Sequence, residues 1–145
     1  MRKTKVLRAK VLAIALSSIA LSSGTTQVAA GDAKAYDEHV QCEGDDCKID
    51  LFLTRGFRAF SQCQVCHGLD GAGSTIAPSL LDKTKELDKA AWMDVIENGK
   101  TGQIGVMPPW KDNPNVMKYV ENLYLYLLAR SDGKIPAGKL KRFDR

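Results

Sequence analysis

Two cysteines and a histidine stand together in the stretch Cys63-Gln64-Val65-Cys66-His67. Three kinds of chemistry use two thiols and an imidazole in such a group: a structural zinc site, a redox-active disulfide, or covalent attachment of a haem. The compartment in which the chain works, and the secondary structure around the stretch, discriminate among these three interpretations.

The first thirty residues have the pattern of a cleaved secretory signal. Five basic residues between Arg2 and Lys10 precede an apolar run from Val11 to Leu21, and small residues follow as far as Ala30. An uncleaved membrane anchor is the alternative, but the run is about 11 residues long, whereas a span needs about 20. We therefore predict that residues 1–30 are a signal peptide and that the mature chain works in the periplasm.

Removal of this segment changes the charge of the chain. The whole sequence has 145 residues and a formal net charge of +4, with 21 basic and 17 acidic residues. The signal contains 5 of the basic residues and none of the acidic ones, so the mature chain carries −1. A chain of about 115 residues is long enough for one core and too short for two.

The remaining charge divides the mature chain into three predicted parts. Residues 31–49 form an acidic extension that contains Cys42 and Cys47, residues 50–133 form the folded domain, and residues 134–145 form a basic tail. The extension and the tail show no core pattern, which is typical of solvated ends.

The hydrophobic pattern predicts an all-α fold. Apolar residues recur at helical spacing in three segments, and no segment shows the alternation that is typical of a strand. Each helix is expected to begin at a capping side chain, namely Asp50, Asp88 and Asn113. The first predicted helix leads directly into Cys63, the second ends at Gly99, and the last ends at Gly133.

The surroundings of the cysteines favour haem attachment. The spacing of Cys42, Cys47, Cys63 and Cys66 is similar to that of a four-cysteine zinc ribbon, but exported thiols tend to be oxidised. A thioredoxin-like redox pair is disfavoured because no strand–helix–strand pattern surrounds it. The motif C-x-x-C-H attaches c-type haem: each thiol adds to one vinyl group, and the adjacent His67 reaches the iron. We therefore predict one covalently bound haem c.

The motif and its flanking landmarks resemble those of the small class I c-type cytochromes, over residues 50–130. Gly56 and Phe60 match the first helix of that family, and residues 123–127 match the last helix, which crosses the first near its glycine. The resemblance implies a small helical bundle around one haem.

The same resemblance implies the ligands of the iron. Residues 76–80 match the loop in which a proline carbonyl, here that of Pro78, accepts a hydrogen bond from the proximal histidine, here His67. Gly99 and Met107-Pro108 match the segment that carries the second iron ligand. Pro108 also biases Met107 towards an extended conformation, and a thioether opposite a histidine raises the haem potential.

Other side chains could replace Met107 as the second ligand. Met93 and Met117 lie within helical patterns, where packing is the more natural role. His39 is the second histidine of the chain and lies in the polar extension. Two-histidine ligation through His39 is therefore the alternative to ligation by Met107.

Several residues outside the motif have predicted roles. In an oxidising compartment the simplest interpretation of Cys42 and Cys47 is a disulfide. The acidic residues around this pair raise the hypothesis of a calcium site. Trp92 is expected in the core, whereas Trp110 fits either the core or a contact with the haem propionates.

Ligation by His67 and Met107 would leave no open position on the iron, which predicts a single-electron carrier and not an enzyme. The alternative is a haem enzyme or gas-binding protein in which Met107 dissociates. The acidic extension, the segment Met107-Pro108-Pro109-Trp110 and the basic tail resemble the cytochromes that serve pyrroloquinoline quinone (PQQ) alcohol dehydrogenases.

This second resemblance implies electron transfer from such a dehydrogenase towards a terminal oxidase, and the direct acceptor is expected to be a terminal oxidase or another cytochrome. A general carrier between a quinol-oxidising complex and an oxidase is the alternative. No nucleic-acid partner and no stable membrane insertion after signal cleavage are expected.

Overall fold

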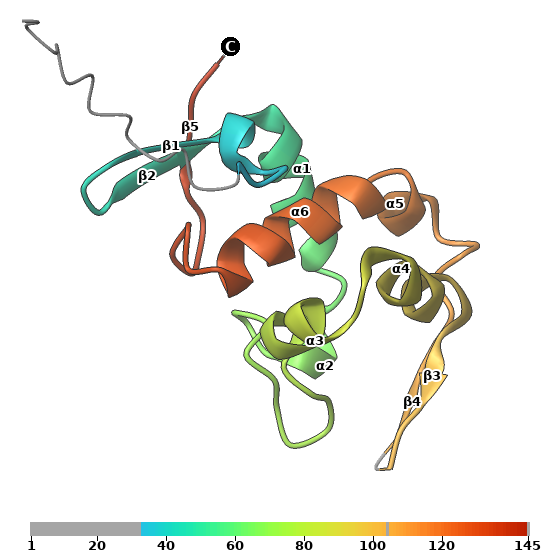
Figure 1. Cartoon of the computed structure of the whole chain (residues 1–145). Coiled ribbons are helices and arrows are strands. Elements are labelled where there is room, and N and C mark those ends of the chain that lie inside the picture. Colours follow the sequence, from blue (N-terminus) through green and yellow to red (C-terminus); the bar gives the residue numbers. More distant parts are fainter. Residues whose placement is uncertain (1–32, 104, 145) are drawn as a thin grey trace, which may run out of the picture. The chain divides into compact units, whose positions relative to one another are not determined.

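The computed structural model describes residues 33–103 and 105–144, and helices predominate among them (Figure 1). The predicted signal peptide, residues 1–30, lies outside the described residues. The helical elements are η1 (Asp37–His39), α1 (Leu51–Phe60), α2 (Gln64–His67), α3 (Leu80–Glu86), α4 (Lys89–Asn98), α5 (Pro114–Met117) and α6 (Val120–Ser131). The strands are β1 (Val40–Glu43), β2 (Asp46–Ile49), β3 (Lys100–Thr101), β4 (Val106–Met107) and β5 (Lys141–Arg142). In the part of the chain that the structure describes, no helix is both long enough and apolar enough to cross a bilayer.

The three predicted capping side chains are confirmed. The Asp50 carboxylate accepts a hydrogen bond from the backbone N–H of Leu53 at 3.1 Å, and Asp88 accepts one from Ala91 at 2.8 Å. The side-chain oxygen of Asn113 accepts from the N–H of Asn115 at 3.0 Å, with Pro114 in the first turn. These contacts satisfy backbone donors that have no partner within the helix.

Two helices differ from the sequence prediction. The segment after Asn113 is not one helix, because α5 ends at Met117 and α6 starts at Val120. A short helix, α3, forms where a loop was expected, and Ser79 caps it by accepting from the N–H of Asp82 at 3.1 Å. Only Leu80 and Thr84 are buried in α3, and two positions are too few to give a recognisable period.

The first and last helices cross in direct contact (Figure 1). A Cβ atom built on Gly56 in α1 would lie 2.1 Å from the carbonyl oxygen of Asn122 and 2.8 Å from Cβ of Tyr126, both in α6. Next to this contact the Asn122 side-chain amide donates to the carbonyl of Phe52 at 3.0 Å. Gly56 therefore permits a backbone approach that no other residue would allow, as the family resemblance implies.

The prediction of an all-α fold is confirmed only in part, because the described residues contain two small sheets. β1 and β2 form an antiparallel hairpin, and β5 from the basic tail pairs in parallel with β2. A second ribbon pairs β3 with β4. The strands have two to four residues each, and strands this short show no readable alternation, which is why the sequence pattern does not reveal them.

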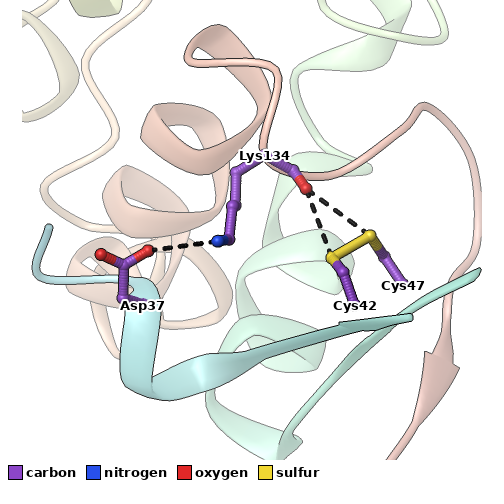
Figure 2. The surroundings of a disulfide bond; sticks show 4 residues. All are labelled: Asp37, Cys42, Cys47 and Lys134. Atoms are coloured by element: carbon purple, nitrogen blue, oxygen red, sulfur yellow. Dashed lines mark hydrogen bonds and ion pairs between the residues drawn. A yellow bond between two sulfur atoms is a disulfide. The ribbon is translucent and has the colours of Figure 1, made fainter. Parts of the chain in front are cut away.

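The predicted disulfide between Cys42 and Cys47 is present, and it joins residues that face each other in β1 and β2 (Figure 2). The carbonyl oxygen of Lys134 lies 3.6 Å from each sulfur, and the Lys134 ammonium lies 3.7 Å from the Asp37 carboxylate. Ile135 follows and is only 2% exposed. The expectation of a tail without core contacts is therefore wrong, because the tail packs against the extension.

Candidate functional site

The two thiols and the imidazole of the C-x-x-C-H motif project from a single turn of helix. The N–H of Cys63 donates to the carbonyl of Phe60 at 2.8 Å, so α1 leads directly into this turn. The N–H of His67 donates to the carbonyl of Cys63 at 2.9 Å, which closes the turn. Cys63 and Cys66 are both free thiols, and burial raises the pKa of Cys63 to about 11. That thiol is therefore neutral near pH 7.

The loop after the motif holds the histidine ring. Nδ1 of His67 lies 2.7 Å from the carbonyl oxygen of Pro78. A carbonyl oxygen can only accept, so the proton of the neutral ring lies on Nδ1 and the lone pair lies on Nε2. This is the contact between His67 and Pro78 that the family resemblance implies.

Ser74 holds this loop against α2. Its hydroxyl donates to the carbonyl of Cys66 at 2.5 Å and accepts from the N–H groups of Ile76 and Ala77 at 3.1 and 3.3 Å. The sequence analysis did not identify Ser74. A serine after a glycine-rich segment is a turn signal that would have suggested such a role.

Met107 lies in a segment that follows α4, far from the C-x-x-C-H motif in the sequence. It pairs with Lys100 across the β3–β4 ribbon. Gly99, with φ +73°, precedes the ribbon, and a Cβ atom there would lie 2.4 Å from the Met107 carbonyl oxygen. The N–H of Trp110 donates to the carbonyl of Ile96 at 3.0 Å, which fastens the segment after Met107 to the end of α4. The Met107 segment is thus anchored on both sides.

One cavity of about 1000 Å³ is lined by all five predicted cofactor-binding residues, namely Cys63, Cys66, His67, Pro78 and Met107. Apolar side chains from α3, α4 and α6 and their flanking residues form much of its wall, including Leu80, Leu87, Trp92, Ile96, Leu123 and Leu127. This volume lies at the upper end of the range of about 300–1000 Å³ that is typical of ligand sites.

The donor set fits a covalently attached haem. Two free thiols are available for the vinyl groups, and an imidazole nitrogen and a thioether are available for the iron. The apolar wall suits the faces of a large aromatic macrocycle. The vinyl groups, the iron and the ring faces of haem c thus each have a matching group in the cavity.

The zinc and calcium hypotheses have less support in the structure than haem attachment has. The zinc alternative needs four thiolates, but Cys42 and Cys47 are oxidised to a disulfide. Within residues 33–103 and 105–144, no group of three or more histidine, cysteine, aspartate or glutamate side chains is arranged to hold a metal ion. In the acidic turn where calcium was considered, Asp46 pairs with Lys141 at 3.2 Å.

The alternative second ligands lie elsewhere. His39 is buried, its Nδ1 lies 2.9 Å from the Asp50 carboxylate, and its ring stacks on Phe52 at 4.4 Å between centroids. Its expected place in a solvated polar extension is therefore wrong, and it does not line the cavity. Met93 and Met117 pack against the core and also do not line the cavity.

Both tryptophans line the cavity. Trp92 is 3% exposed and meets the ring of Tyr124 edge-on, with centroids 5.2 Å apart. Its predicted core position is confirmed, and it also forms part of the cavity wall. Trp110 is half-buried at the end of the Met107 segment.

Comparison with known proteins gives consistent matches. The family model described as cytochrome c oxidase, cbb3-type, subunit III matches residues 53–127, a segment that includes the motif and Met107. Cytochrome c-555 of Methylococcus capsulatus is 36% identical over 96 residues, which is 65% of this chain and 75% of that protein. Cytochrome c-553I of Paracoccus denitrificans is 38% identical over 103 residues, which is 67% of this chain and 46% of that protein.

A solved structure agrees with these sequence matches. The crystal structure of the c-type cytochrome XoxG from Methylobacterium extorquens AM1 matches with a TM-score of 0.63 and 40% identity. The match covers 68% of this chain and 62% of that one. The chain therefore spans less than two thirds of XoxG and of cytochrome c-553I.

Proposed function

Because this chain belongs to the monohaem class I c-type cytochromes and carries one covalently bound haem c, we propose that it transfers single electrons between redox proteins in the periplasm. The observation that carries the proposal is the convergence of Cys63, Cys66, His67 and Met107 on one apolar cavity. We assign the two thiols to the thioether bonds, and Nε2 of His67 and the sulfur of Met107 to the iron. Residues 1–30 are the segment proposed to direct export.

The hydrogen bond to Pro78 prepares His67 for its role. It keeps the proton on Nδ1, so that the lone pair of Nε2 remains available to a metal. It also fixes the plane of the ring and makes the imidazole a stronger donor. Ser74 acts through this bond, because it holds the loop that presents the carbonyl.

Met107 is presented by a segment that resists rearrangement. Gly99 and Trp110 fix its two ends, and the following prolines limit its backbone freedom. The bound haem supplies a one-electron couple between ferric and ferrous iron. His67 and Met107 would both hold the iron, and a fully ligated iron would leave no place for a substrate to bind, which favours a carrier over an enzyme.

We propose that the electron leaves through the solvent-exposed part of the cavity lining, which we call the mouth. Three large apolar side chains on or next to the cavity lining are strongly exposed: Val65 (83%), Val106 (71%) and Ile76 (57%). Exposed apolar side chains of this kind often mark a contact surface. Lys100 lies on the same rim and adds a positive charge.

We propose a PQQ-dependent alcohol dehydrogenase as electron donor and a terminal oxidase as the eventual acceptor. Support comes from the acidic extension with its cysteine pair, the Met107–Trp110 segment and the basic tail, which together resemble the cytochromes of that system. In the fold the extension and the tail join in one sheet, so they form a single surface feature rather than two loose ends.

The test is reduction of the purified oxidised holoprotein by candidate donors, followed by stopped-flow absorbance across a range of salt concentrations. A substrate-reduced PQQ alcohol dehydrogenase should reduce the haem rapidly, and the rate should fall as salt rises. Reduction by a quinol-oxidising complex but not by the dehydrogenase would instead support the general respiratory carrier. Rapid binding of carbon monoxide or cyanide by the wild-type protein would contradict ligation of both axial positions.

A further inference from the structure

A second, smaller pocket of about 330 Å³ lies between α1, the end of β2 and the basic tail. We call it the tail pocket. Its lining residues are Ile49, Thr54, Phe57, Arg58, Lys139, Leu140, Lys141 and Arg142. None of them lines the haem cavity. In Figure 1 the sheet that contains β5 lies on the opposite side of α6 from α2 and α3.

The rim of the tail pocket is strongly cationic. Four of its eight lining residues are basic, and none is acidic. Lys141 is paired with Asp46 at 3.2 Å and Arg142 with Asp144 at 2.8 Å. Arg58 and Lys139 form no ion pair with any described residue. Among the residues that the structure describes, two positive charges on the rim, those of Arg58 and Lys139, therefore have no acidic partner.

The floor of the same pocket is apolar. Ile49 is 2% exposed, and the half-buried Phe57 meets the ring of Tyr126 edge-on, with centroids 5.7 Å apart. Leu140 is half-buried on the tail side. An apolar floor inside a cationic rim suits an apolar side chain that is flanked by carboxylates.

The adjacent strand offers a place for an extended backbone. β5 pairs with β2 on one side, and its other side has no neighbouring strand among the described residues. Such an edge leaves backbone N–H and C=O groups available to a segment from another chain. The edge and the pocket are formed by the same residues, Lys141 and Arg142.

We propose that the tail pocket binds an acidic, extended segment of a partner protein. One apolar or aromatic side chain of that segment enters between Phe57 and Leu140, and its carboxylates face Arg58 and Lys139. A concave pocket beside a strand edge suits a polypeptide better than a flat lipid surface, and its apolar floor distinguishes it from a site for a free anion.

Binding at the tail pocket goes beyond the proposed electron-transfer function. It rests on that function only for the reason why a partner would be held there. Because the tail pocket and the haem cavity share no residue, a partner held at the former leaves the mouth of the latter accessible. Tethering of this kind raises the effective concentration of the two redox centres without adding contacts at the mouth.

The experiment titrates isotope-labelled reduced holoprotein with short synthetic peptides at low salt, about 0.01 M, where the Debye length is about 30 Å. The test peptide alternates aspartate and glutamate around one central phenylalanine. One control peptide replaces the phenylalanine with serine, and another replaces the acids with lysine. The amide shifts induced by the test peptide should be saturable and confined to residues 49–58 and 139–143. Both control peptides should bind at least about tenfold more weakly.

Single substitutions leave the buried Ile135 in place, whereas deletion of the tail would remove it. Lys139→Glu should weaken the test peptide about tenfold at low salt, with a smaller effect at high salt. Lys85→Glu is the matched control, because Lys85 is exposed on α3 and lines neither pocket. Leu140→Ser should weaken the test peptide but leave the weak binding of the serine peptide unchanged.

Four outcomes would overturn the proposal. The first is no saturable binding, and the second is a set of shifts centred on Val65, Ile76 and Val106 at the haem mouth. The third is equal weakening by Lys139→Glu and Lys85→Glu, which would mean unspecific charge attraction. The fourth is that inorganic phosphate or phosphatidylglycerol vesicles perturb the tail pocket while the peptide does not, which would assign it to an anion or to a membrane surface. None of these results depends on the identity of the electron donor.

Discussion

Replacing Gly56 with alanine should destabilise the folded protein, because the new methyl group has no space at the crossing of α1 and α6. The added Cβ atom would lie 2.1 Å from the Asn122 carbonyl oxygen, whereas real Cβ contacts are essentially never under 3.0 Å. The helices would have to separate by about 0.9 Å. The obstructing atom belongs to helical backbone, so a side-chain rotation cannot relieve the clash.

The magnitude follows from two opposing effects. Overpacking of a well-packed contact costs typically about 1–3 kcal/mol, and a clash with backbone lies at the upper end of that range. Alanine recovers roughly 0.5–1 kcal/mol, because it restricts the unfolded chain and favours helix more than glycine does. We therefore expect a net loss of about 2 kcal/mol, or a fall in Tm of roughly 8 °C for a domain of this size.

Guanidinium chloride unfolding of the purified holoprotein, followed by circular dichroism, measures this loss. The control is Lys85→Ala, which adds no bulk at an exposed position of α3 that lines neither pocket. That variant should stay within about 0.5 kcal/mol of the wild type. A Gly56→Ala protein as stable as the wild type would refute the argument that the backbone contact limits this crossing.

Three further predictions test the haem site and the disulfide. In the Cys63→Ala/Cys66→Ala double variant, acidified organic solvent should extract any bound haem, and haem that resists extraction would contradict thioether attachment. Met107→Ala should lower the midpoint potential and allow carbon monoxide to bind the ferrous protein, as measured by redox titration and absorbance; an unchanged potential would point to another ligand. Cys42→Ser/Cys47→Ser should cost about 2 kcal/mol or less in the free energy of unfolding, because the closed loop is short. Its haem spectrum should match that of the wild type, and a changed spectrum would mean that the hairpin supports the haem site.

Those parts of the haem site whose chemistry depends on residues close together in the sequence could be predicted from the sequence alone. The spacing of Cys63, Cys66 and His67 specifies thiols and imidazole on one helical turn without reference to the rest of the chain. The caps at Asp50 and Asp88 were equally readable, because a capping side chain bonds to a backbone group three residues away. The contact of His67 with Pro78 and the role of Met107 came from a family resemblance rather than from local pattern.

The sheets, the burial of His39 and the fate of the tail depended on tertiary structure. β5 has two residues, and it forms only because β2 offers it a partner more than ninety residues earlier in the chain. Asp50 and Phe52 hold the ring of His39 in place. The polar residues next to His39 in the sequence do not reveal this burial. The haem cavity likewise takes its wall from helices that are separate in sequence. Local sequence thus determined which groups can bond to a haem, whereas packing between distant segments decided which of them share a cavity, because burial and pairing are properties of the whole fold.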